Sequence, residues 1–81
     1  MENLDPMKVV DRIIADIQAP KRFRRFVSLA NLEKKEGSLK KAKFYRTVAC
    51  DLGLANRRNE KNNRPGGMIW TDEALKLRRK P

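Results

Sequence analysis

A run of twelve residues without an apolar side chain, NRRNEKNNRPGG, separates two segments that should be ordered. The run occupies positions 56–67 and ends on a proline followed by two glycines, a composition that fits neither a buried helix nor a central strand. We therefore expect a mobile basic surface loop over residues 56–67. The longer part of the chain before this loop must supply most of the core, and the shorter part after it must pack back onto that core.

The length of the chain limits the size of that core. With 81 residues we expect one domain, 1–81, and such a domain buries only about 60% of the surface that its unfolded chain exposes. No apolar segment approaches the ~18 residues of a membrane span, and the acidic start MENLDP does not look like a signal peptide. One cysteine and no histidine argue against disulfides and against a zinc site, and no other cofactor is indicated. We expect a cytoplasmic protein, or a nuclear one in a eukaryote.

Three segments before the loop show the apolar spacing of helices. The first begins after Asp5, a good N-cap, and ends before Pro20. The second is predicted over residues 21–36, followed by a glycine, and the third over residues 38–53. The side chains of the third helix that are predicted to face inward are Leu39, Ala42, Tyr45, Val48, Ala49 and Leu52.

The segment after the loop supplies an apolar anchor. Residues 68–70 should form a short extended piece in which Trp70 ties the end of the chain to the bundle, and Thr71 should cap a last helix. Residues 76–81 are a basic C-terminal tail. The fold class is thus mainly α: a small three- to four-helix bundle with a basic loop and a short extended segment before the last helix. A winged-helix-like arrangement has similar proportions and is the alternative, but only one strand-like segment is visible.

Residues 47–55, TVACDLGLA, resemble the first half of a helix-turn-helix motif. A small residue, Ala49, precedes the turn residue Gly53 by four positions, with apolar residues around both. The second half does not follow, because the positions that should bury apolar side chains fall in the polar run after residue 55. A turn at Gly37 fits no better, since Lys43 and Arg46 would occupy apolar positions. We assign no family on these nine residues.

The charge of the chain is strongly positive and uneven. Lysine and arginine number 20 against 10 acidic residues, which gives a formal net charge of +10. Residues 1–18 contain two basic and four acidic residues, so the excess lies after residue 18. Such a field attracts polyanions, of which nucleic acid is the commonest. The alternative is that the charge only keeps a small protein soluble.

The basic side chains fall on the second helix, the third helix, the loop and the tail. On the second helix, basic and small polar residues would form one row, although an ordinary solvated face would look similar. In the loop, arginine offers bidentate donors to phosphate or guanine, although a solvated linker is the alternative. Phe44 and Tyr45 could stack on a base, but aromatic residues at this spacing usually pack in a core. The predicted nucleic-acid contacts are Lys21, Arg24, Lys35, Lys40, Lys43, Arg46, Arg57, Arg58, Lys61, Arg64, Arg78 and Arg79.

These features predict a small basic nucleic-acid-binding protein, DNA more than RNA, that acts as an accessory or regulatory factor, for example in transcription. The alternative is a small basic inhibitor or adaptor, such as one encoded by a phage or other mobile element, that occupies an acidic surface of an enzyme or nucleoprotein complex. A homodimer would cover leftover apolar surface. We expect no membrane partner and no enzyme, because the sequence has no Gly-rich phosphate loop, no Ser with a His base and no cluster of acids.

Overall fold

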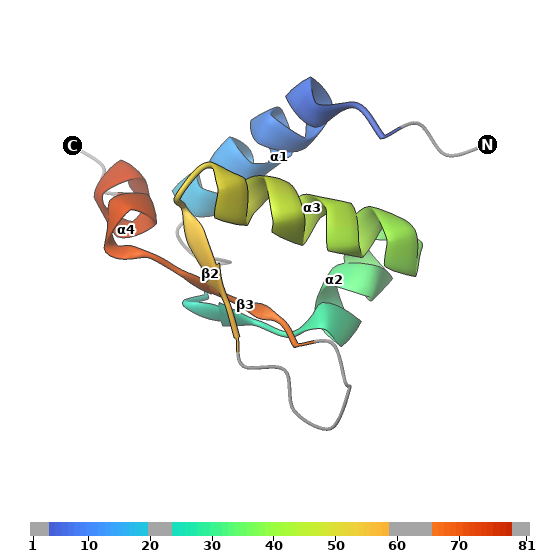
Figure 1. Cartoon of the computed structure of the whole chain (residues 1–81). Coiled ribbons are helices and arrows are strands. Elements are labelled where there is room, and N and C mark those ends of the chain that lie inside the picture. Colours follow the sequence, from blue (N-terminus) through green and yellow to red (C-terminus); the bar gives the residue numbers. More distant parts are fainter. Residues whose placement is uncertain (1–3, 20–23, 59–65, 79–81) are drawn as a thin grey trace.

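The computed structural model describes residues 4–19, 24–58 and 66–78, which form a mostly helical fold with a small sheet (Figure 1). In chain order the elements are α1 (Pro6–Gln18), β1 (Phe26–Val27), α2 (Leu29–Glu36), α3 (Leu39–Asp51), β2 (Ala55–Arg57), β3 (Met68–Trp70) and α4 (Asp72–Arg78). The mainly helical class is confirmed. None of the helices in the described ranges is long and apolar enough to cross a membrane.

Helix boundaries follow the capping residues of the sequence. The carboxylate of Asp5 accepts a hydrogen bond from the backbone N–H of Met7 (3.0 Å), so α1 begins as predicted. The hydroxyl of Ser38 accepts from the backbone N–H of Lys41 (3.1 Å) at the start of α3. Between α2 and α3 the chain turns at Gly37, whose φ of 89° is accessible mainly to glycine. Three of the four described helices therefore begin where the sequence predicts.

The second helix is shorter than predicted. It begins at Leu29, not near residue 21, because Ser28 caps it by accepting a hydrogen bond from the backbone N–H of Asn31 (3.2 Å). Residues 26–27 form β1 instead. The predicted row of basic and polar side chains along one helix face is therefore wrong, because Arg24 and Ser28 precede the helix.

The sheet has three strands where the sequence suggested one extended segment. The strand order is β1-β3-β2, and both outer strands run antiparallel to β3. Phe26 and Asn56 both pair with Ile69, while Ala55 pairs with Trp70. Residue 53 leads into β2 and not into a second helix, so the partial helix-turn-helix pattern at 47–55 is not completed. The predicted loop 56–67 begins inside β2, and its residues 59–65 lie outside the described ranges.

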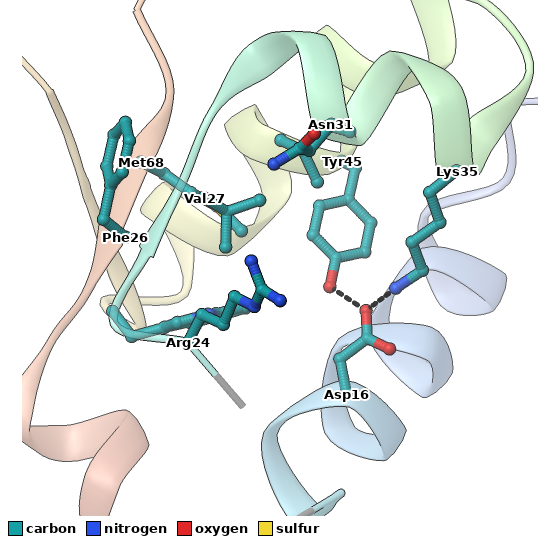
Figure 2. A pocket seen from close by; sticks show the side chains of 10 residues that line it. Asp16, Arg24, Phe26, Val27, Asn31, Lys35, Tyr45 and Met68 are labelled. Carbon is teal, nitrogen blue, oxygen red and sulfur yellow. Dashed lines mark hydrogen bonds and ion pairs between the residues drawn. The ribbon is translucent and has the colours of Figure 1, made fainter. Parts of the chain in front are cut away.

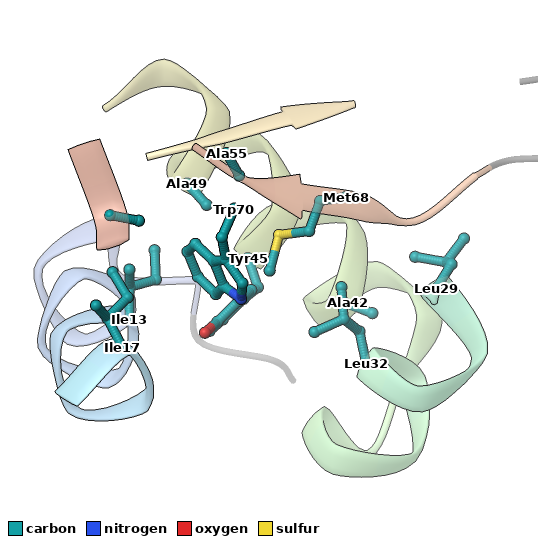
Figure 3. Close-up of a cluster of buried hydrophobic side chains, with 11 residues drawn as sticks. Ile13, Ile17, Leu29, Leu32, Ala42, Tyr45, Ala49, Ala55, Met68 and Trp70 are labelled. Carbon is teal, nitrogen blue, oxygen red and sulfur yellow. The ribbon is translucent and has the colours of Figure 1, made fainter. Parts of the chain in front are cut away.

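The core lies between the four described helices and the inner face of the sheet, with Trp70 near its centre (Figure 3). Trp70 is 3% exposed, which confirms its predicted role as an anchor. Two of the α3 side chains predicted to face inward are exposed, Leu39 by 40% and Leu52 by 48%, and Val48 is only partly buried. Leu39 and Leu52 stand at the first position and the C-cap of α3, where fewer neighbouring turns surround a side chain. The buried apolar residues are Ile13, Ile17, Leu29, Leu32, Ala42, Tyr45, Ala49, Ala55, Met68, Trp70 and Ala74.

Candidate nucleic-acid interface

One side of α3 faces away from the core and carries basic and hydroxyl groups. Lys40, Lys43 and Thr47 are spaced by three and four residues, so they share one side of the helix. The buried residues Ala42 and Ala49 lie on the opposite side. Both lysines are exposed, and Thr47 is half-buried. This side of α3 can therefore meet a partner without any rearrangement of the core.

Strand β2 adds an arginine to the same surface. Because Arg57 pairs with the buried Met68, its side chain leaves the sheet on the face that packs against α3. Its guanidinium Nη2 donates to the hydroxyl oxygen of Thr47 at 3.5 Å. Lys43, Thr47 and Arg57 thus form a polar surface from two elements. We call the surface made by Lys40, Lys43, Thr47 and Arg57 the α3–β2 face.

Arg58 leaves the strand on the other face of the sheet. Successive side chains of a strand point to opposite faces, so Arg58 does not join Arg57. Its guanidinium lies over the ring of Phe26, 4.6 Å from the ring centroid. Phe26 is 42% exposed, and its ring holds this cation at the end of β2. The sequence placed Phe26 inside the helix predicted over residues 21–36 and so missed this contact with Arg58.

Arg46 is the predicted contact residue whose position differs most from expectation. It is 6% exposed, because it sits on the side of α3 that turns toward the sheet. Its guanidinium donates a hydrogen bond to the carbonyl oxygen of Gly66, at the end of the loop between β2 and β3. The Arg46 side chain therefore holds the start of the segment before β3 and does not lie on the exposed side of α3.

The hairpin is packed tightly at the same end. A Cβ atom on Gly67 would lie 1.9 Å from the carbonyl oxygen of Val27. The backbone N–H of Arg58 donates to the carbonyl oxygen of Gly67 at 3.1 Å, which extends the β2–β3 pairing by one step. The described ends of the hairpin, Arg58 on one side and Gly66 and Gly67 on the other, are thus held by backbone contacts as well as by Arg46.

Cys50 lies on α3 near these arginines and is half-buried. Burial raises the pKa of its thiol, and the positive charges of Arg57 and Arg46 offset part of that rise. A thiol with a raised pKa is protonated at neutral pH and is a poor nucleophile. Cys50 therefore acts as a small, partly buried side chain.

Ion pairs remove several cations from consideration. In the described parts of the chain, Lys40, Lys43 and Arg57 make no ion pair with an acidic group. Asp51 is exposed at the C-terminal end of α3, where its negative charge limits the basic surface. Lys8, Lys34 and Lys41 are also without ion pairs in these ranges, so positive charge is not confined to one face. The ion pairs are Arg12 with Glu36, Arg25 with Asp72, Lys35 with Asp16 and Lys76 with Glu73.

The other predicted contact residues are separated from the α3–β2 face. Arg24 and Lys35 line a cavity between α1, β1, α2 and α3, and Arg78 is half-buried on α4. The structure does not describe four of them, which are Lys21, Lys61, Arg64 and Arg79. Thr47 was absent from the predicted contacts, although its spacing of four residues from Lys43 indicates its position.

Comparisons with known proteins add no assignment: no family model matches the chain, and neither a curated protein nor a solved structure is significantly similar to it.

Proposed function

We propose that the protein binds duplex nucleic acid, DNA in preference to RNA, through the α3–β2 face. The observation that carries the proposal is the contact of Arg57, from β2, with Thr47 of α3, one helical turn from the exposed Lys43. Lys40 extends the same surface toward the start of α3. These cations are exposed and lack acidic partners in the described ranges, so phosphate groups would not have to displace an internal ion pair.

The dimensions of α3 suit the major groove of B-DNA. A helix of 13 residues is roughly 20 Å long, and the groove is about 12 Å wide and accepts one helix. Lys40 and Thr47 are separated by about 10 Å along the helix axis. Lysine side chains can reach phosphates or the O6 and N7 atoms of guanine, and a threonine can contact several base edges. A-form RNA has a major groove too narrow for this entry.

The order of the elements supports a winged-helix-like reading, which we include in the proposal. Helices α2 and α3 are consecutive and turn at Gly37, in the way of a helix-turn-helix pair whose second helix enters the major groove. The sequence spacing argued against a turn there because Lys43 and Arg46 would take apolar positions, but the structure buries Arg46 and leaves Lys43 exposed. The β2–β3 hairpin follows directly and would act as the wing. Arg57 and Arg58 stand at its base, so the wing would approach the phosphates beside the groove that holds α3.

A binder of this kind acts by occupying or marking a site on DNA, as an accessory or regulatory factor. The proposal requires no cofactor and no catalytic group. In such a protein the affinity comes mostly from contacts with phosphates, and the specificity comes from contacts between α3 and base edges in the groove.

Fluorescence anisotropy with duplex DNA, single-stranded DNA and duplex RNA of equal length tests the proposal at two salt concentrations. We expect duplex DNA to bind most tightly and to be released as salt rises. The Lys40→Ala/Lys43→Ala variant should lose about tenfold or more in affinity. The control Lys8→Ala/Lys76→Ala removes the same charge from α1 and α4 and should lose much less.

Two results would contradict the proposal. Equal losses in the two double variants would mean that general charge, and not the α3–β2 face, attracts DNA. No binding of any nucleic acid at low salt would favour the other prediction from sequence, a small basic protein that occupies an acidic protein surface. Circular dichroism of each variant shows whether its fold is intact.

A further inference from the structure

A cavity of about 460 Å³ lies among α1, β1, α2 and α3, on the core side of α3 (Figure 2). Its volume is within the range of about 300 to 1,000 Å³ that is usual for small-molecule sites. The outward side of α3, with Lys40 and Lys43, takes no part in its lining. The cavity is therefore separate from the α3–β2 face, and any ligand in it would leave that face free.

The floor of the cavity is apolar. Val27, Leu32, Met68 and Trp70 contribute to it, and the ring of Tyr45 stands beside them. Three of these side chains, Leu32, Met68 and Trp70, are already part of the buried core. An occupant would consequently rest against fixed hydrophobic side chains, which favours a ligand with a compact apolar body.

Asp16, the acidic residue that lines the cavity, already interacts with two other lining residues. The Tyr45 hydroxyl donates to Oδ2 of Asp16 at 2.5 Å, and the Lys35 ammonium pairs with the same oxygen. Burial, followed by the hydrogen bond to Asp16, raises the pKa of the Tyr45 hydroxyl well above its ordinary value, so this donor keeps its proton. Asp16 thus balances the charge of Lys35, and among the described residues it makes no ion pair with Arg24.

Arg24, the other cation of the lining, has no acidic partner among the described residues. In the described parts of the chain its guanidinium has no hydrogen bond or ion pair, and it extends into the cavity toward Tyr45 (Figure 2). Among the described residues the Asn31 side chain, which also lines the cavity, makes no hydrogen bond. With Asp16, Lys35 and Arg24 counted together, the lining carries one net positive charge.

We propose that this cavity binds a small organic acid with an apolar body. The planar guanidinium of Arg24 can hold a carboxylate through two parallel hydrogen bonds, which a lysine could not do. The Asn31 amide lines the same cavity and can donate or accept a hydrogen bond there. The hydrocarbon part rests on the floor formed by Met68 and Trp70. This inference does not depend on nucleic-acid binding.

The protein contains its own reporter for the test. Trp70 is the sole tryptophan of the chain and lines the cavity, so its fluorescence responds to an occupant. Cyclohexanecarboxylate is a suitable probe because it does not absorb where tryptophan does. Its matched probes are cyclohexanecarboxamide, which is neutral, and cyclohexylammonium, which is positive. We expect a saturable change with the carboxylate, binding about tenfold or more weaker with the amide, and no saturable change with the ammonium.

The Arg24→Gln variant should lose the preference for carboxylate over amide while it keeps the fold, because Arg24 is exposed and has no ion-pair partner to lose among the described residues. Lys34→Gln is the matched control, since it removes an exposed cation of α2 outside the lining and should bind as the wild type does. Equal responses to all three probes would overturn the proposal, as would unchanged carboxylate binding in Arg24→Gln. Amide NMR spectra of the wild type provide the second readout: no shifts at millimolar carboxylate would also overturn it.

Discussion

The guanidinium of Arg46, on α3, donates a hydrogen bond to the carbonyl oxygen of Gly66, which lies just before β3. A helix and a hairpin loop are thereby joined at one buried point. The two parts of the proposed interface, the outward side of α3 and the base of the β2–β3 hairpin, are consequently held in one arrangement before any partner arrives.

Replacing Arg46 with methionine should destabilise the protein more than the same change at Arg57. The Arg46 side chain is buried, and its loss leaves the Gly66 carbonyl without that donor, at a cost of about 1.5 to 3 kcal/mol. Arg57 is exposed, and its contact with Thr47 is long at 3.5 Å, so Arg57→Met should change stability by less than about 0.5 kcal/mol. Urea unfolding of both variants measures the difference. Equal stabilities would show that Arg46 does not support the hairpin.

Gly67→Ala should be poorly tolerated. The added Cβ would meet the backbone oxygen of Val27 at 1.9 Å, and a backbone group cannot rotate away as a flexible side chain can. We expect a loss of about 2 kcal/mol or more in the free energy of unfolding. The control is Gly37→Ala, where nothing lies within 4 Å and the cost is only the left-handed backbone, about 1 to 2 kcal/mol. If Gly67→Ala proves more stable than Gly37→Ala in thermal unfolding, the close contact between Gly67 and the Val27 backbone is wrong.

Ser28→Ala tests where α2 begins. As an N-cap, Ser28 satisfies the backbone N–H of Asn31, and its replacement should cost about 1 kcal/mol. In a helix that ran from residue 21, the same position would be internal, and alanine would stabilise that helix slightly. The sign of the change in urea unfolding therefore distinguishes the two arrangements.

Stability should fall at high pH because of Tyr45. Its hydroxyl is buried and bonded to Asp16, which raises its pKa in the folded state, while the unfolded chain titrates near the ordinary value of 10.0. Above that pH the unfolded state gives up a proton that the folded state keeps, so unfolding becomes more favourable. The loss should reach about 1.4 kcal/mol at a pH of about 11, relative to neutral pH. Tyr45→Phe cannot titrate, so urea unfolding of both proteins isolates this contribution. Parallel declines in the two proteins would contradict it.

The helix boundaries of α1, α3 and α4 could be predicted from the sequence because each depends on local signals. Asp5, Ser38 and Thr71 cap the helices that follow them, and the apolar spacing after them is regular. The first strand could not be found in this way. It has two residues, too few to show a period of two, and its Phe26 and Val27 also fit a helical stripe.

Strand β2 and the role of Arg46 depend on contacts distant in sequence. Ala55 is the single buried residue of β2, and the polar residues after it form a strand only because β3 pairs with them. A basic residue on a helix flank is expected at the surface, so burial of Arg46 against the loop end was not predictable. Of the proposed site, Lys40 and Lys43 followed from helical spacing, whereas the alignment of Arg57 with them required the sheet register.

The most direct test of the central claim is the salt dependence of duplex DNA binding, measured for the wild type and for Lys40→Ala/Lys43→Ala. On duplex DNA each phosphate that a protein neutralises adds about 0.9 to the slope of log affinity against log salt. If both lysines contact phosphates, the slope of the variant should be shallower by about 2. A variant whose slope and affinity match those of the wild type would contradict the claim that the outward side of α3 contacts DNA.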